Sequence, residues 1–143
     1  NKELIGTLNT GERLAFVNGC FDVLHYGHLK LLSYAKASAD KLIVAIDSDT
    51  RVKESKGPNR PYNDQEVRKF FLESLVYVDK VEIFNSEQEL EQIVKRLSPD
   101  IMIVGSEYKE RHVVGSQYAK SLEFFGKING YSTTKILQHA GDR

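Results

Sequence analysis

Short apolar runs without polar alternation constrain the fold of this chain more than any other feature of its sequence. Residues 42–46 and 101–104 read LIVAI and IMIV, and residues 14–17 read LAFV. A strand without a polar face is covered on both sides, which is typical of parallel sheets flanked by helices. We therefore expect these three runs to be strands of a parallel sheet, together with residues 80–84 and 122–125.

Helical patterns separate these runs. Leucines and alanines at three- and four-residue spacing follow Gly27 and mark one face of a helix. Two further helices are predicted, one begun by Asn63 and Glu66 and one by Ser86 and Glu89, because both pairs have the spacing of a capping box. The predicted core-facing residues of the helix after Asn63 are Val67, Phe70, Phe71 and Leu75.

The alternation of strands and helices predicts the fold class. It favours α/β: a Rossmann-like three-layer α/β/α sandwich with a parallel five-stranded sheet. With 143 residues and no linker or repeat, the chain is expected to form a single domain, 1–143. Ligands of such sheets bind beyond the carboxyl ends of the strands. The candidate site segments are therefore 18–28, 47–61, 105–112 and 126–134.

Charge and composition narrow the class of protein. The 20 Lys and Arg residues balance the 20 Asp and Glu residues, so no basic field favours nucleic acid or a membrane surface as a partner. No apolar run approaches the roughly 20 residues that span a bilayer, and the first residues do not resemble a signal peptide. The lone Cys20 excludes an internal disulfide and fits the reducing cytoplasm. The chain begins with Asn1 rather than Met, which leaves open the alternative that it is part of a longer, bifunctional protein.

Two histidines flank the start of the first predicted helix. Residues 19–28 read GCFDVLHYGH, with His25 and His28 three residues apart and Gly27 permitting close backbone approach. A helix N-terminus attracts anions, and both imidazoles can donate hydrogen bonds to phosphate oxygens. Spacing alone also fits a plain helix cap, whereas zinc is disfavoured because no further ligands are near in sequence. Asp22 fits either orienting a histidine or the water shell of a metal, or stabilising the turn.

A second polar segment lies near the carboxyl end of the chain. Residues 130–136 read GYSTTKI, and a closing helix is predicted over residues 132–137. Three consecutive hydroxyls, those of Ser132, Thr133 and Thr134, would meet the first N–H groups of this helix. An ordinary N-cap needs only one hydroxyl, so the segment favours a phosphate-binding site.

Together the two segments resemble the signatures of the cytidylyltransferase-like nucleotidyltransferases, G-x-F-D-x-x-H-x-G-H and G-x-S-T-T-x-I. The resemblance implies an enzyme that transfers a nucleoside monophosphate from an NTP, bound with Mg²⁺, to a phosphorylated small molecule. It implies catalytic roles for His25 and His28, a substrate contact at Asn18, and a homodimer. The implied nucleotide-binding residues are Gly19, Cys20, Phe21, Asp22, Gly27, Tyr131, Ser132, Thr133 and Thr134.

The middle of the chain narrows the resemblance. Residues 53–61 read KESKGPNRP and resemble the K-x-x-K-G-x-x-R-P loop of bacterial heptose-1-phosphate adenylyltransferases. Residues 99–109 are similar to the P-D-x-L-V-K-G-G-D-Y-K stretch of the same family. The glycine and two prolines within residues 53–61 predict an irregular loop over residues 53–62. The resemblance implies catalytic roles for Lys56 and Arg68. It also implies nucleotide contacts from Gly105 and Glu107 and substrate contacts from Lys53 and Arg60.

Departures from that pattern leave the substrate open. Val104, Ser106 and Glu107 stand where the heptose family has Lys, Gly and Asp. Lys127 lies near the place of an Arg in glycerol-3-phosphate cytidylyltransferases, and it is a further candidate substrate contact. ATP with D-glycero-D-manno-heptose 1-phosphate is the first expectation, and CTP with glycerol 3-phosphate or a similar alcohol phosphate is the alternative. A non-catalytic nucleotide-binding module is the third, which the histidine pair and the three hydroxyls disfavour.

Overall fold

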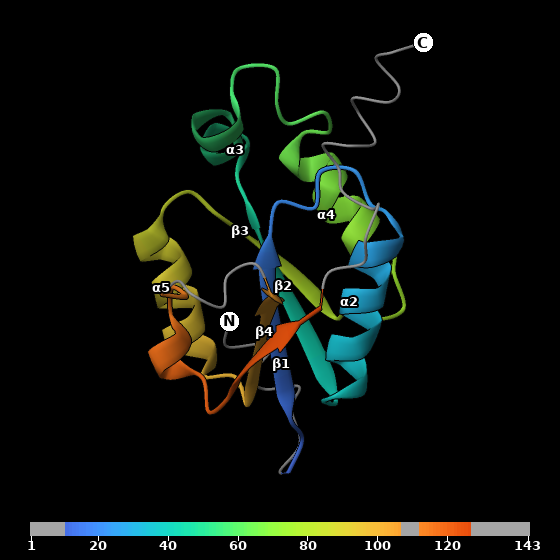
Figure 1. Cartoon of the computed structure of the whole chain (residues 1–143), viewed down its shortest axis with the longest axis vertical. Helices are drawn as coiled ribbons and strands as arrows, with labels where there is room; N and C mark the ends of the chain where they lie inside the picture. The colour runs from blue at the N-terminus through green and yellow to red at the C-terminus, as the bar shows by residue number, and fades with distance from the viewer. Residues whose placement is uncertain (1–10, 107–111, 127–143) are drawn as a thin grey trace.

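A parallel sheet with helices on both faces organises the chain in the computed structural model, which describes residues 11–106 and 112–126 (Figure 1). The five strands have the spatial order β3-β2-β1-β4-β5, and neighbouring strands pair in parallel. The predicted fold class is confirmed. The strands are β1 (Leu14–Gly19), β2 (Lys41–Asp47), β3 (Lys80–Phe84), β4 (Ile101–Gly105) and β5 (Leu122–Phe125). The helices are α2 (Tyr26–Ala37), α3 (Asp49–Lys56), α4 (Gln65–Glu73) and α5 (Glu87–Leu97), with a 3-10 turn η2 (Ser116–Tyr118).

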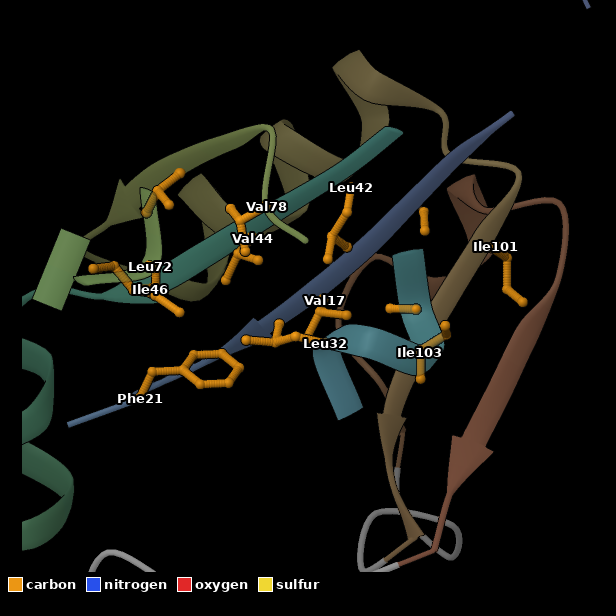
Figure 2. Packing of buried hydrophobic residues seen from close by; sticks show 13 residues of the cluster. Val17, Phe21, Leu32, Leu42, Val44, Ile46, Leu72, Val78, Ile101 and Ile103 are labelled. Atoms are coloured by element: carbon orange, nitrogen blue, oxygen red, sulfur yellow. The ribbon is translucent and has the colours of Figure 1, made fainter. Parts of the chain in front are cut away.

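Successive residues of the central strands point into different hydrophobic clusters. Phe16 and Ile43 pack in the cluster that also contains residues of α5. Val17 packs in the other cluster with Leu32 of α2 and Leu72 of α4 (Figure 2). Because both faces of β1 and β2 are covered, neither strand has a polar face, and this explains the runs without alternation.

The chain reverses its direction of travel across the sheet at β1. From β1 it proceeds outward through β2 to β3, and it then returns to place β4 on the other side of β1. Open α/β sheets bind ligands outside the carboxyl ends of the strands at such a switch in strand order. The loop that follows β1 therefore begins at the favoured position for a ligand.

Helix α3 corrects the first part of the predicted irregular loop, because residues 53–56 are helical, whereas residues 57–62 are irregular as predicted. Its N-cap is Ser48, whose side chain accepts a hydrogen bond from the N–H of Arg51 at 3.3 Å. Lys and Glu residues are good helix formers and extend the helix to Lys56. Gly57 ends it with φ of 102°, a conformation that other residues rarely adopt. The glycine and prolines therefore terminate a helix instead of excluding one.

Helix α4 buries a different face from the one that the sequence predicted. Its N-cap is Asp64 rather than Asn63, and Asp64 accepts a hydrogen bond from the N–H of Val67 at 2.9 Å. Arg68 and Leu72 are its buried residues. The predicted core face was wrong for Val67, Phe70 and Phe71, because the buried side carries Arg68, which is held by hydrogen bonds, together with Leu72, which packs in a hydrophobic cluster. Of the predicted core residues, Val67 is 39% exposed, Phe70 69% and Phe71 50%, while Leu75 packs partly buried on the core.

The other predicted elements agree with the structure where it describes them. Ser86 caps α5 by accepting a hydrogen bond from the N–H of Glu89 at 3.1 Å, and β3 and β5 have the predicted bounds. The helix predicted over residues 132–137 lies outside the described residues. Within residues 11–106 and 112–126, no helix has the length and apolar character needed to cross a membrane.

Candidate active site

The loop after β1 places the side chain of Phe21 in the hydrophobic core. Phe21 is 5% exposed, adopts a positive φ of 50°, and packs its ring 5.1 Å from the ring of His28. Gly19 makes room for this packing, since a Cβ there would lie 3.1 Å from the Phe21 ring. The side chain of Phe21 thus packs against His28 from the core side. Only the backbone of Phe21 is then left for the predicted nucleotide contact.

His25 and His28 form a reciprocal cap at the start of α2. His25 is the N-cap, and its Nδ1 accepts a hydrogen bond from the N–H of His28 at 3.4 Å. The Nδ1 of His28 accepts one from the N–H of His25 at 3.2 Å. The two rings are stacked, with centroids 3.8 Å apart and planes inclined by 23°. The plain-cap interpretation of this pair is therefore correct as far as Nδ1 is concerned.

The cap fixes which nitrogen of each ring carries a proton. A nitrogen that accepts a hydrogen bond is unprotonated, so the proton of a neutral imidazole then lies on Nε2. Burial, aided by the nearby charges of His25 and Lys56, lowers the pKa of His28 from 6.5 to about 3. His28 is thus neutral at physiological pH, with Nε2 as its hydrogen-bond donor. Capping and phosphate binding are compatible because they use different nitrogens.

Asp22 joins this loop to the segment that precedes α4. It is 3% exposed, and its carboxylate accepts hydrogen bonds from the N–H groups of Tyr62 at 2.7 Å and Asn63 at 2.8 Å. The Asn63 side chain returns a bond of 2.8 Å to the carbonyl oxygen of Asp22. These contacts correspond to neither predicted role toward a histidine or a metal. They are closer to the predicted stabilising role, although the stabilised segment lies about 40 residues away in sequence.

Arg60 is held by the same carboxylate. Its Nε donates to Asp22 Oδ2 at 3.1 Å, and its side chain is 15% exposed. Its Nη2 is buried and has no hydrogen-bond partner among the described residues. A buried donor without an acceptor is unusual in a folded protein and requires an explanation, such as a functional role or a bound water or ion. The exposed Lys53 donates from Nζ to the Arg60 carbonyl at 3.0 Å, which keeps these two predicted substrate contacts together.

Lys56 lies at the end of α3 and is exposed. Its positive charge is among the causes that lower the pKa of His28, after burial and His25. It also opposes the effect of burial, which raises the pKa of the Cys20 thiol. Lys56 is therefore within electrostatic reach of both residues, as a residue that binds phosphate beside the histidines would be.

The side chain of Arg68 is buried and bonded within the protein. Its side chain is 0% exposed, and its guanidinium donates to four acceptors of the protein itself. A direct contact with a phosphate, as the resemblance implied, would require this network to open. The sequence missed two of the residues involved near here: Asp49, the partner of Arg68, and Asn63, which was interpreted only as a helix cap.

The remaining predicted residues divide into two groups. Asn18 and Gly19 end β1, Gly27 lies in the first turn of α2, and Gly105 ends β4. These positions are all at the carboxyl side of the sheet or at the helix start beside it. Six predicted residues lie outside the described part of the chain and stay predictions: Glu107, Lys127, Tyr131, Ser132, Thr133 and Thr134.

The carboxylates near the site are already engaged by arginines. Asp22 pairs with Arg60, Asp47 with Arg51, and Asp49 with Arg68. Among the described residues, no group of three His, Cys, Asp or Glu side chains could hold a metal ion. This part of the chain therefore offers no protein cage for Mg²⁺, which commonly binds through substrate phosphates and water instead.

A parallel sheet whose central strand leads to paired imidazoles at a helix N-terminus defines a class of phosphate-handling nucleotide-binding domains. Comparison with models of known protein families shows which family within this class the chain matches. Residues 16–139 match the cytidylyltransferase-like family, and the chain belongs to it. The chain is accordingly a nucleotidyltransferase.

Curated proteins with similar sequences narrow the comparison from the family to individual relatives. The chain is 42% identical over 135 residues to the bifunctional protein HldE of Campylobacter fetus, an alignment that covers 94% of this chain and 29% of that protein. It is 45% identical over 128 residues to the bifunctional protein HldE of Nitratiruptor, with coverage of 90% and 28%. The chain thus spans less than a third of the length of these relatives.

Solved structures agree on the fold. A lipopolysaccharide core biosynthesis protein of Thermoplasma volcanium superposes with a TM-score of 0.66 at 24% identity, covering 83% of this chain and 100% of that one. The pantoate-beta-alanine ligase of Francisella tularensis superposes with a TM-score of 0.61 at 15% identity, covering 92% and 65%. At these identities the likeness establishes the architecture alone.

Proposed function

We propose that this chain transfers an adenylyl group from ATP to D-glycero-D-manno-heptose 1-phosphate and releases pyrophosphate. The observation that carries the proposal is the reciprocal cap of His25 and His28, which turns two Nε2–H groups into phosphate donors at the switch point of the sheet. The choice of acceptor rests on residues 53–61, which resemble the loop of heptose-1-phosphate adenylyltransferases, and on the relatives named HldE.

In the proposed reaction, an oxygen of the acceptor phosphate forms a bond to the α-phosphorus of ATP. The bond from this phosphorus to the bridging oxygen breaks in line, and pyrophosphate leaves with the electron pair. The Nε2–H groups of His25 and His28 stabilise charge on the α-phosphate and the leaving group. Since its pKa is about 3, His28 donates as a neutral ring, and Lys56 supplies positive charge nearby.

The acceptor phosphate is proposed to lie at Arg60. Among the residues that the structure describes, the buried Nη2 of Arg60 has no hydrogen-bond partner, and a phosphate oxygen would supply the missing acceptor. The pairing of Arg60 with Asp22 holds the guanidinium in place before the substrate arrives, which reduces the entropy lost on binding. Lys53 is the second proposed contact, and Ser132, Thr133 and Thr134 are proposed to hold the triphosphate.

Mg²⁺ is proposed to arrive with ATP. When bound, the ion would neutralise part of the charge on the phosphates. Three carboxylates near the site, those of Asp22, Asp47 and Asp49, pair with arginines, which supports coordination by phosphate oxygens and water rather than by these side chains.

The test is pyrophosphate release with Mg²⁺ in four substrate combinations, ATP or CTP with heptose 1-phosphate or glycerol 3-phosphate. Release with ATP and the heptose phosphate supports the proposal, and H28A should lose it. Release with CTP and glycerol 3-phosphate would instead establish the cytidylyltransferase alternative. No release in any combination, with NTP binding intact, would overturn the proposed reaction and favour a non-catalytic nucleotide-binding module.

A homodimer is proposed as the assembled form. Val67, Phe70 and Phe71 share an exposed apolar face of α4, with Glu66 and Lys69 beside them. Charges of both signs beside an apolar face allow a self-complementary contact with a second copy about a two-fold axis.

We place the reaction in the cytoplasm, where NTPs are available and the lone Cys20 would stay reduced.

A further inference from the structure

Arg68 connects four segments that surround the candidate active site. Its Nη1 donates to the carbonyl oxygens of Cys20 at 3.0 Å and Asp47 at 2.7 Å. Its Nε donates to the carbonyl oxygen of Asn63 at 3.0 Å, and its Nη2 donates to Asp49 Oδ1 at 2.7 Å. These acceptors belong to the loop after β1, the end of β2, the segment before α4 and the start of α3.

We propose that Arg68 is a positioning residue that holds the catalytic histidines and Lys56 at a fixed separation, without touching substrate. This inference rests on the proposed function. The contact with Cys20 restrains the loop that leads to His25, and the contact with Asp49 restrains the helix that ends at Lys56. A misplacement of about 1 Å at a reacting group can lower a rate by about 10²-fold, so such restraint is valuable.

The chemistry of the acceptors explains why arginine occupies this position. A guanidinium presents five N–H donors in a rigid planar fork, whereas a lysine ammonium directs three donors from a single atom. The four acceptors of Arg68 are spread over both terminal nitrogens and Nε. The carboxylate of Asp49 balances the buried charge. Lysine at this position could satisfy only part of the set.

The competing interpretation is that Arg68 merely stabilises the core. Leu72 provides the matched control, because it lies one turn later in α4 and is also fully buried, but belongs to a hydrophobic cluster. Kinetics of R68M, R68K and L72A should be compared at a temperature where circular dichroism shows all three folded. We expect R68M to lower kcat by about 10–100-fold with a smaller change in KM, as for a residue that acts on transition-state geometry. R68K should restore part of the loss, and L72A should keep kcat per folded molecule.

A second readout is independent of catalysis. Cys20 is the single cysteine of the chain and is partly buried, so its alkylation by iodoacetamide reports opening of the loop after β1. We expect alkylation in R68M to be about tenfold faster than in L72A, because local opening rather than global unfolding exposes the thiol. Should R68M fail to fold, D49A removes one end of the network and should change both readouts in the same direction.

The outcomes separate the two proposals. If the wild-type protein released no pyrophosphate, the proposed function would fail, and the alkylation rates would still decide whether Arg68 restrains the loop. Wild-type kcat and a wild-type alkylation rate in folded R68M would overturn the inference. Equal effects of R68M and L72A on both readouts would also overturn it, since a purely stabilising role predicts that result.

Discussion

The side chains of His25 and His28 each accept a hydrogen bond from the backbone N–H of the other, at 3.4 and 3.2 Å. The exchange caps α2 and at the same time commits each ring to donate from Nε2. Two properties that are usually considered separately, helix stability and readiness to bind phosphate, therefore depend on the same two side chains. Suitable substitutions can separate these properties.

Replacing His25 with Asn should keep the helix cap and remove the phosphate donor. Asparagine is among the best N-cap residues, so H25N should unfold near the wild-type urea concentration, whereas H25A should lose about 1 kcal/mol. Both variants should lower kcat for pyrophosphate release by roughly 10²–10³-fold, because each lacks the Nε2 donor. Urea unfolding and a coupled pyrophosphate assay measure the two effects. Wild-type turnover in H25N would show that His25 is a cap and nothing more.

The low pKa of His28 should make stability depend on pH. Burial lowers this pKa from 6.5 to about 3, so between these values the unfolded chain binds a proton at His28 that the folded chain does not. The free energy of unfolding should therefore fall as the pH drops from 6.5 toward 3. Glutamine does not titrate, so H28Q should lose less stability than the wild type between about pH 7.5 and about pH 5. Urea unfolding at both pH values tests this, and equal losses would contradict it.

Removing Asp22 should leave the charge of Arg60 buried and unpaired. Breaking a buried ion pair by deleting one partner costs about 3–5 kcal/mol, and we expect D22A to lose stability at the lower end of this range. The matched control is D64A, which removes the exposed N-cap of α4 and should lose about 1 kcal/mol. Urea denaturation measures both. The double variant D22A/R60M should be more stable than D22A, and a further loss would show that the orphaned charge is not the cause.

The two faces of α4 should respond differently to substitution. Leu72 is 0% exposed, and L72A should lower the free energy of unfolding by about 2–5 kcal/mol. Phe70 is 69% exposed, and F70S should change the stability of the monomer by no more than about 0.5 kcal/mol. If a second copy covers this face, F70E should shift sedimentation from dimer toward monomer. An unchanged dimer in F70E would exclude this face as the interface.

The strands could be predicted because their signal is local. A short run such as residues 42–46, apolar throughout, favours a strand covered on both faces, and β2 confirms this. The buried face of α4 could not be predicted in the same way. Three of the four acceptors of Arg68 lie 19, 21 and 48 residues away in sequence, and no window over the helix contains these three. The aromatic residues of α4 gave a misleading signal, because their spacing is helical whichever side faces the core.

The same distinction applies to the candidate site. His25 and His28 are three residues apart, so their capping geometry follows from the helix that they begin. The contacts of Asp22 with Arg60 and Asn63 span 38 and 41 residues, and no spacing rule connects them. The family resemblance predicted a role for Arg60, but only the folded chain shows that Asp22 balances the charge of Arg60.

Three of the four acceptors of Arg68 are backbone carbonyl oxygens, those of Cys20, Asp47 and Asn63. Every amino acid supplies a carbonyl oxygen, so substitutions at these three positions can leave the acceptors unchanged. Selection to keep the network would therefore act on Arg68 and spare most of its partners. Such contacts produce no covariation between Arg68 and these three positions, and their loss in a distant relative would be seen as the change of a single arginine, with Asp49 as the one side-chain partner.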